Sequence, residues 1–198
     1  RGRDRDEIGA TLAALTAWLE GTSDDPGGWG LAALAPARSR QSRHGAIVLP
    51  FRALLAAVED ARRECSARMS EWEINALVPN EQRFIGPADR SARYGLRYAR
   101  QLFTPRQLLA GATALEELRR VVVEAGRELS ERQTRGLNLY LAFALDKALD
   151  YNSRLSSWDA TRMKVRNTFD RHDFSFKWSF AEFDAASALV PWAVNNAV

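Results

Sequence analysis

The chain has 198 residues, of which 46% are hydrophobic and 27% charged, a composition typical of a folded domain rather than of a disordered segment. The formal net charge of +3 is too small to identify a class of partner by itself. The single cysteine excludes an intrachain disulfide, and with only two histidines nothing resembles the paired Cys or His spacings of a zinc or iron site, so we expect no metal.

Residues 1–45 are predicted to form a helix followed by a long loop. Apolar residues recur at helical spacing and predict an amphipathic helix that ends near Gly21. They are Ile8, Leu12, Leu15 and Leu19. From there to residue 45, glycines, prolines and a polar cluster are typical of a surface connection. We therefore divide the chain into residues 1–45 and a helical domain over residues 46–198.

A second helix is predicted to follow a short strand. The β-prone residues 46–49 favour a strand, and Pro50 suits the first turn of a helix. Apolar residues then recur along one helix face, at Phe51, Leu54, Leu55, Val58, Cys65 and Met69. Val78-Pro79-Asn80 and Gly86-Pro87 predict a loop beyond this helix.

The clearest helix start in the sequence is Thr104-Pro105-Arg106-Gln107. A hydroxyl cap, a proline at the first helical position and a glutamine three residues after the cap satisfy free backbone amides. Residues 130–133 repeat the capping pattern and predict another helix. Its residues 137–145 are apolar on nearly all sides, so we expect that helix to be central and buried.

Beyond residue 150 the predicted elements are short. Asp159 suits the cap of a short helix that carries Met163, Val165 and Phe169. Alternating aromatic residues over 174–180 are typical of a half-buried strand. The predicted fold is thus mainly α, a multi-helix domain with one or two short β-strands.

Five arginines between residues 90 and 106 form a basic patch with Asp89 as the only nearby acid. They are Arg90, Arg93, Arg97, Arg100 and Arg106. If the segment is helical, the first four share one stripe, with Tyr94 beside it and Phe103 following. Guanidinium groups interleaved with aromatic rings are suited to bind a phosphate backbone and to stack on an unpaired base. The alternative is that Tyr94 and Tyr98 anchor the core and the arginines form solvated or salt-bridged caps.

Two further polar positions have competing interpretations. Asn152 follows the predicted buried helix, where it could contact a ligand, although capping of the helix end is favoured. Glu182 lies among aromatic residues, where burial could raise the pKa of its carboxyl group and so suit it to catalysis. A partly exposed acid near a strand end is the plainer interpretation of Glu182.

The sequence contains no complete catalytic site. No Gly-rich phosphate loop follows a strand and no nucleophile elbow occurs. Two histidines and one cysteine cannot assemble a His-Asp-Ser or paired-Cys set. We therefore assign no catalytic or cofactor-binding residue and expect the isolated chain to be inactive.

The sequence also bears on the cellular setting. Cys65 falls in a helical pattern and is expected to be a buried, unreactive thiol, which fits a reducing cytoplasm. The longest apolar runs are far shorter than the about 20 residues that cross a bilayer, so we expect no membrane contact. The start lacks an initiator Met and the apolar core of a secretory signal, which suggests a piece whose native ends lie elsewhere.

A set of stretches occurs in a characteristic order along the chain. They are Tyr94-Gly95, Leu102-Phe103-Thr104-Pro105-Arg106-Gln107-Leu108-Leu109, Tyr140-Leu141-Ala142, Asp150-Tyr151-Asn152-Ser153, Trp158, Thr168-Phe169 and Trp178-Ser179-Phe180-Ala181-Glu182. This order resembles large bacterial adenine-specific DNA methylases that often carry a zinc ribbon, over about residues 79–182. Gln101 and Ser179 depart from that pattern, which has an acid at each of these positions.

The resemblance implies a place within a larger enzyme. In that family the S-adenosylmethionine site is a Gly-rich loop before such a segment, and a catalytic Asp-Pro-Pro-Tyr motif follows it. Neither motif occurs in this chain. The resemblance thus implies a non-catalytic helical segment with a DNA-recognition or lid role in a methyltransferase. It also implies S-adenosylmethionine for the full-length protein, the remaining methyltransferase domains of the same polypeptide as partners, and a role in DNA methylation and phage defence.

The leading hypothesis is that this segment positions DNA. Its nucleic-acid-binding residues would be Arg97, Arg100, Arg106, Tyr94, Phe103 and Asn152. The arginines would bind phosphates, and Tyr94 or Phe103 would lie near a flipped base. The alternative is a structural or protein-interaction helical module without nucleic-acid contact. Acids interleaved with the arginines would favour this alternative.

Overall fold

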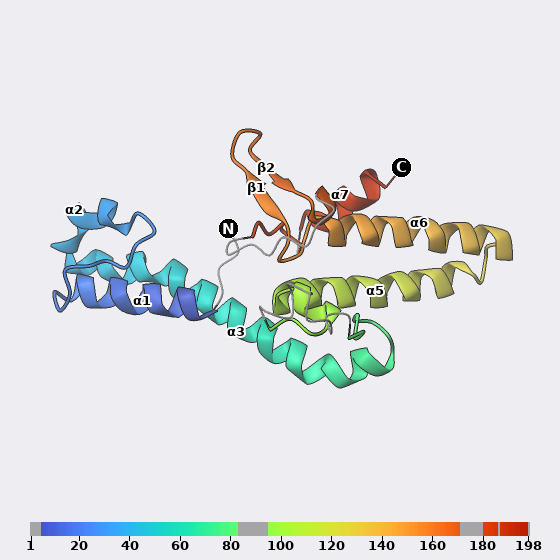
Figure 1. The fold of residues 1–198 in the computed structure, drawn as a ribbon, viewed down its shortest axis with the longest axis horizontal. Helices are drawn as coiled ribbons and strands as arrows, with labels where there is room; N and C mark the ends of the chain where they lie inside the picture. The colour runs from blue at the N-terminus through green and yellow to red at the C-terminus, as the bar shows by residue number, and fades with distance from the viewer. Residues whose placement is uncertain (1–4, 83–94, 171–179, 186, 198) are drawn as a thin grey trace. The chain divides into compact units, whose positions relative to one another are not determined.

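The computed structural model describes residues 5–82, 95–170, 180–185 and 187–197, and α-helices dominate this part of the chain (Figure 1). The prediction of a mainly α fold is confirmed. The helices are α1 (Arg5–Leu19), α2 (Ala35–Arg38), α3 (His44–Ile74), α5 (Pro105–Ala125), α6 (Glu131–Asp150) and α7 (Leu189–Asn195). Strands β1 (Ser157–Asp159) and β2 (Lys164–Arg166) form an antiparallel pair.

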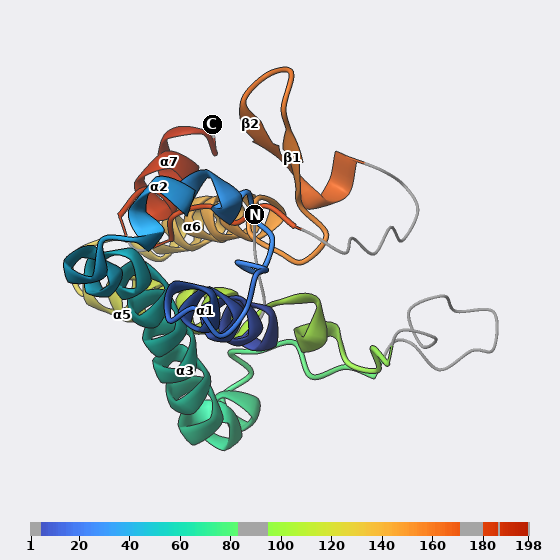
Figure 2. The same cartoon turned by 90° about the vertical axis from the view of Figure 1, so that its left-hand side faces the viewer.

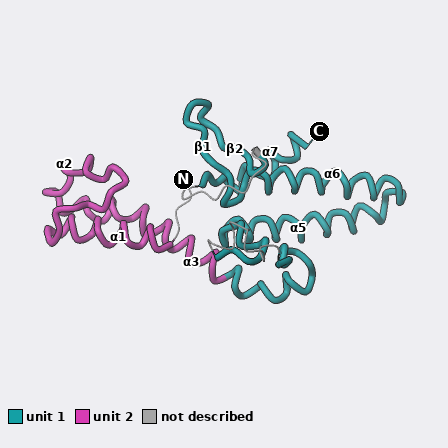
Figure 3. The backbone as a smooth tube through the Cα atoms, viewed as in Figure 1, with its two compact units in different colours: residues 1–2, 64–198 teal, residues 3–63 magenta. Residues whose placement is uncertain are grey.

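The chain packs as two compact units, coloured separately in Figure 3. One covers residues 3–63 and the other runs from Glu64 onward, so the division falls inside α3. The composition of the sequence suggested a boundary near residue 45, where the Gly- and Pro-containing connection ends. Each unit has its own buried apolar cluster, which is the property of an independently packed unit.

In the unit of residues 3–63, α1 packs against the segment that follows it. The helix predicted over Ile8 to Leu19 is confirmed, and its apolar face is buried with Leu31 and Val48. Gly27, at φ +90°, crosses α1 so closely that a Cβ there would lie 2.7 Å from Ala14 Cβ. The connection predicted as a loop contains short helical turns beyond this glycine, at Leu31–Leu34, in α2 and at Gln41–Arg43.

The strand predicted at residues 46–49 is wrong, because these residues belong to the first turns of α3. Pro50 correspondingly lies inside the helix rather than at its start. Val48 is buried in the apolar cluster against α1, with 5% of its surface exposed. Tertiary packing has therefore overridden the β propensity of this short run. The second predicted helix, from Phe51 to Met69, is confirmed within α3.

The core of the unit that runs from Glu64 onward lies where the end of α3 meets α5. Trp72 is fully buried there and packs with Leu108 and Ala112. Arg68 supports this packing from the side, because its guanidinium donates to both oxygens of Glu116 at 2.6 and 2.7 Å. Cys65 is buried in the same cluster, as predicted, and this burial raises the pKa of its thiol.

Helices α5 and α6 begin at the two predicted capping sequences. The Thr104 side chain accepts from the backbone N–H of Gln107, and the Gln107 side chain accepts from the backbone N–H of Thr104 at 2.9 Å. Ser130 and Gln133 repeat this reciprocal arrangement at the start of α6. Figure 1 shows the two helices side by side and antiparallel.

The prediction that the second of these helices is buried on all sides is wrong. Ala144 and Ala148 of α6 are buried, between α5 and α7, whereas Leu139 and Phe143 are 56% and 52% exposed. An apolar periphery indicates a buried helix only when neighbours exist on every side. Among the described residues, α6 has no such neighbour on the face that carries Leu139 and Phe143.

The helix predicted to start at Asp159 is also wrong, because the segment forms the hairpin of β1 and β2 seen in Figure 2. Trp158 pairs with Val165 across the two strands. Asp159 does accept backbone N–H groups, from Thr161 and Arg162 at 3.0 and 3.1 Å, but these belong to the hairpin turn. The same Asx geometry starts turns and helices, so the residue alone did not separate them.

Several predicted features lie outside the described residues: Gly86-Pro87, most of the strand over 174–180, and Arg90, Arg93 and Tyr94 of the basic patch. Between Gly95 and Thr104 the described part of the patch is not an α-helix, and Arg106 lies in the first turn of α5. From Gly95 the patch runs as extended chain into a single 3-10 turn, Ala99–Leu102. No helix among the described residues is long and apolar enough to cross a membrane.

Candidate functional site

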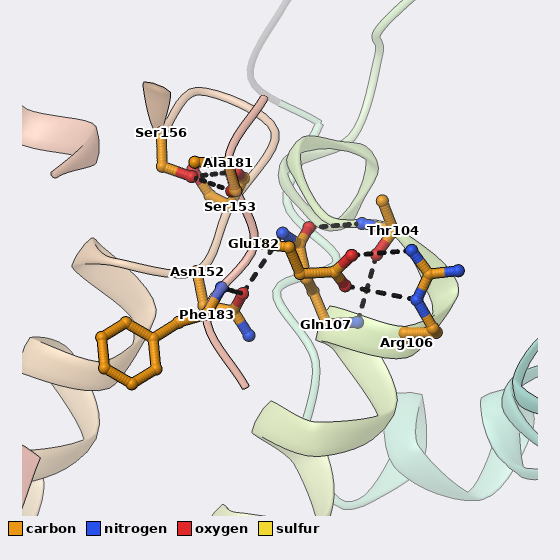
Figure 4. Close-up of polar contacts among 9 residues, drawn as sticks. All are labelled: Thr104, Arg106, Gln107, Asn152, Ser153, Ser156, Ala181, Glu182 and Phe183. Carbon is orange, nitrogen blue, oxygen red and sulfur yellow. Dashed lines mark hydrogen bonds and ion pairs between the residues drawn. The ribbon is translucent and has the colours of Figure 1, made fainter. Parts of the chain in front are cut away.

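Gln107 lies at the centre of a buried polar network in the unit that runs from Glu64 onward (Figure 4). It is 2% exposed, and its side-chain oxygen accepts from the Thr104 backbone N–H as part of the α5 cap. Its Nε2 lies 3.4 Å from the side-chain oxygen of Asn152, at the far end of α6. The residue that caps one helix thus also ties that helix to the end of the next.

Asn152 joins a third segment to this pair. Its Oδ1 accepts from the backbone N–H of Phe183 at 3.3 Å, and the residue is 3% exposed. Such a position stabilises the fold, because a buried amide with protein partners costs free energy if those partners are lost. Asn152 therefore does not present its side chain to a nucleic acid on the surface.

Arg106 and Glu182 form the second link between the same segments. Arg106 Nη2 lies 2.6 Å from Glu182 Oε2, and Arg106 Nε lies 3.3 Å from Oε1. The two side chains are 25% and 22% exposed, so the pair is largely withdrawn from water. The Glu182 carboxylate is thus held by a fixed cation, and the guanidinium of Arg106 is turned toward protein.

Ser153 and Ser156 extend the network along the chain that leaves α6. The Ser156 hydroxyl donates to the carbonyl of Ser153 or Ala181, each at 2.7 Å, and Ser156 is fully buried. Arg154, in the same segment, donates from its side chain to the backbone carbonyl of Gln101 at 3.1 Å. Polar groups in three separated segments are therefore satisfied by one another.

The remaining arginines of the predicted nucleic-acid site occupy different environments. Arg97 is exposed. Arg100 Nη1 lies 3.4 Å from Glu73 Oε1, and its guanidinium covers the ring of Tyr98 at 4.4 Å from the centroid. That Nη1 is buried and makes no hydrogen bond with the described residues, so the contact with Glu73 is electrostatic only.

Gln101 has a local role at the 3-10 turn Ala99–Leu102. Its side-chain oxygen accepts from the backbone N–H groups of Arg97 and Tyr98, at 2.6 and 2.9 Å. A carboxylate of similar reach could accept the same two bonds. Either a glutamine or an acid at this position is therefore compatible with the 3-10 turn.

Phe103 contributes to the core rather than to a surface for bases. It packs partly buried against the cluster of Trp72 and Leu108. It also lines a small apolar cavity of about 60 Å³ between α5 and α6, next to Leu145. Sites for drug-sized ligands are typically several hundred Å³, so this cavity does not accommodate a cofactor or a base.

The geometry of the network is that of a structural element. Among the described residues no three His, Cys, Asp or Glu side chains gather as metal ligands. Glu182, the acid singled out as a catalytic alternative, faces Arg106. The six predicted nucleic-acid-binding residues divide into Arg97 at the surface, Arg100 in contact with Glu73, three that hold the fold, and Tyr94 outside the described residues.

Sequence reasoning missed the dual role of Gln107 and the burial of Ser156. The capping pattern predicted only the local half of Gln107's contacts. Its bond to Asn152 depends on how α5 and α6 pack, which no local pattern encodes. A polar residue next to several apolar ones is a weak signal of burial, because most such residues face water.

Comparison with models of protein families, with curated proteins and with solved structures finds no match for this chain. The contacts of the buried network and the placement of the arginines are therefore the structural basis for a functional assignment.

Proposed function

We propose that this chain is a non-catalytic helical segment of an S-adenosylmethionine-dependent DNA adenine methyltransferase. One observation supports the proposal beyond the resemblance itself: residues 102–109, 150–153 and 180–182, on which the resemblance rests, meet in the buried polar network. A satisfied buried network rigidifies the segments that it joins. In this role the segment is a fixed framework against which the other domains of the polypeptide pack.

The proposed contact with DNA is through phosphates, at Arg97. Arg100 and Arg106 already face carboxylates of their own chain, whereas Arg97 is exposed. A phosphate contact from such a side chain fixes the position of DNA without reading its sequence. Target recognition and chemistry would then belong to other parts of the polypeptide.

The second candidate function is a structural or protein-interaction module without nucleic-acid contact. The observation that favours it is the pairing of Arg100 with Glu73 and of Arg106 with Glu182. Acids interleaved with the arginines lower the positive potential that a DNA backbone needs.

A salt titration of DNA binding separates the two functions. Each phosphate neutralised on duplex DNA contributes about 0.9 to the slope of log affinity against log salt. We expect Arg97→Ala to reduce that slope by about one such unit on unrelated DNA sequences. Arg127→Ala, at an exposed arginine in the turn after α5, is the matched control and should leave the slope unchanged. Absence of DNA binding by the folded wild-type chain favours the interaction module.

The link to a methyltransferase has its own test. The coding sequence on either side of the 198 residues should contain a Gly-rich cofactor loop before Arg1 and Asp-Pro-Pro-Tyr after Val198. Calorimetry should detect no S-adenosylmethionine binding by the chain alone. Micromolar binding by the chain, or an open reading frame that has neither motif, contradicts the proposed place in the enzyme.

A further inference from the structure

One face of α6 combines exposed apolar side chains with charges at its two ends. Leu139 and Phe143 stand in the middle of this face, 56% and 52% exposed. Exposed residues at spacings of three and four continue the face in both directions. In chain order the stripe consists of Arg132, Arg135, Gly136, Leu139, Ala142, Phe143 and Asp146.

The stripe carries opposite charges at its two ends. Arg132 and Arg135 lie near the start of α6, and Asp146 lies near its end. Among the described residues Arg135 pairs with Glu131 at 3.5 Å, and because both side chains are at least 74% exposed, water weakens this ion pair. The Asp150 carboxylate is not counted in the stripe, because it already accepts hydrogen bonds from the Asn167 side chain and from the backbone N–H of Phe169.

We infer that this stripe of α6 docks against the same stripe of a second copy of this chain, with the two helices antiparallel about a two-fold axis. A parallel pair would place arginines beside arginines, whereas an antiparallel pair places the basic end of each stripe over the acidic end of the other. In such an isologous contact the same surface of each copy pairs the charges at both ends of the stripe. The helix dipoles are also opposed in this arrangement.

Pairing Arg135 with Asp146 sets the register of the proposed dimer. Arg135 and Asp146 are equally far, along the helix, from the peptide bond between Tyr140 and Leu141. With the axis at that point, Arg135 of each copy faces Asp146 of the other, and Leu139 of each copy faces Phe143 of the other within about one residue. The apolar pair therefore lies at the centre, and the charged pairs flank it, as in protein interfaces generally.

Small residues leave room for this pairing. A Cβ added at Gly136 would meet nothing within 4 Å, and Ala142 is exposed beside Leu139. Neither position therefore carries a bulky side chain that would hold the second helix away.

The expected dimer is weak, because one helix face buries less area than the about 1,600 Å² of a standard stable interface. Sedimentation equilibrium of the 198-residue chain over a range of concentrations should give an average mass that rises from that of the monomer toward twice that value. Leu139→Ala combined with Phe143→Ala should abolish this rise while the circular dichroism spectrum is retained. A wild-type chain that remains monomeric at every concentration overturns the inference.

Charge reversal tests the antiparallel register directly. Arg135→Glu or Asp146→Arg alone should weaken association by about 5- to 30-fold, since two symmetric surface pairs become repulsive. The double variant, with both charges exchanged, should restore it. Arg62→Glu, at an exposed position of α3 in the other unit, is the control and should have no effect. A double variant that associates no better than the single variants overturns the proposal. These measurements involve no DNA, so their outcome is independent of the proposed function.

Discussion

The Arg106 guanidinium and the Glu182 carboxylate meet across 76 residues of sequence, with two nitrogen–oxygen contacts of 2.6 and 3.3 Å. Because both side chains are mostly buried, we expect Arg106→Ala to lower the free energy of unfolding by about 1–3 kcal/mol, by leaving the carboxylate without its partner. Arg120→Ala is the control: its pairs with Glu117 and Glu124 are more than half exposed, so solvent screens them and the loss of Arg120 should change stability much less than the loss of Arg106.

Urea melts would measure both variants, and a double-mutant cycle with Glu182→Gln would isolate the coupling. Equal stability of Arg106→Ala and wild type would mean that Arg106 is free to contact another molecule.

Gln107 and Gln133 occupy the same capping position on α5 and α6 but differ in burial. We expect Gln107→Ala to destabilise the protein by about 2–4 kcal/mol, since it removes a cap and also the amide that faces Asn152 in the interior. Gln133→Ala removes only an exposed cap contact and should cost well under about 1 kcal/mol. Similar midpoints for the two variants in thermal melts would contradict the buried network.

Met163 lies in the turn of the β1–β2 hairpin with φ +51° and a side chain that is 72% exposed. The left-handed region costs a non-glycine residue roughly 1–2 kcal/mol, and little packing is lost by removing this side chain. Met163→Gly should therefore stabilise the hairpin, or at least leave it unchanged, whereas Thr161→Gly, at an ordinary backbone position, should destabilise it. Hydrogen exchange of the strand amides is the measurement, and faster exchange in Met163→Gly would refute the expectation.

The hairpin turn also predicts a dependence on pH. The backbone N–H of Arg162, followed by that of Thr161, holds the pKa of the Asp159 carboxyl below its usual range. A carboxyl with a depressed folded pKa contributes stability above its unfolded pKa, about 3.9, and loses it as the pH falls through the folded value. Order in the hairpin, followed by NMR, should thus decrease below about pH 4, and Asp159→Asn should remove that dependence. A curve unchanged by the substitution would exclude Asp159 as its cause.

The elements that the sequence predicted correctly are those encoded by neighbouring residues. The caps at Thr104 and Ser130 are satisfied within four residues, so their pattern alone was sufficient. The strand at residues 46–49 and the helix after Asp159 were predicted wrongly. At residues 46–49 the packing of Val48 against α1 prevailed over a local β preference, whereas after Asp159 the same local Asx geometry is compatible with a hairpin turn as well as with a helix start.

The candidate site was harder to predict than the fold. The spacing of arginines indicates where positive charge lies along the chain, but whether a guanidinium meets water or a carboxylate depends on residues as remote as Glu73 and Glu182. The same argument applies to the apolar face of α6. Its sequence pattern predicted burial on all sides, and only the placement of the neighbouring helices shows that Leu139 and Phe143 are exposed.

The helix pair α5 and α6 also suggests an order of assembly during synthesis. The two helices are joined by residues 126–130 alone, each starts at its own cap, and contacts between near neighbours in sequence form quickly. The bond between Arg106 and Glu182 must instead close a loop of 76 residues, at a greater cost in chain entropy. A nascent chain that has emerged as far as Asp150 would therefore already contain the paired helices, and the surroundings of Gln107 would be completed only when Asn152 and the segment of Glu182 emerge.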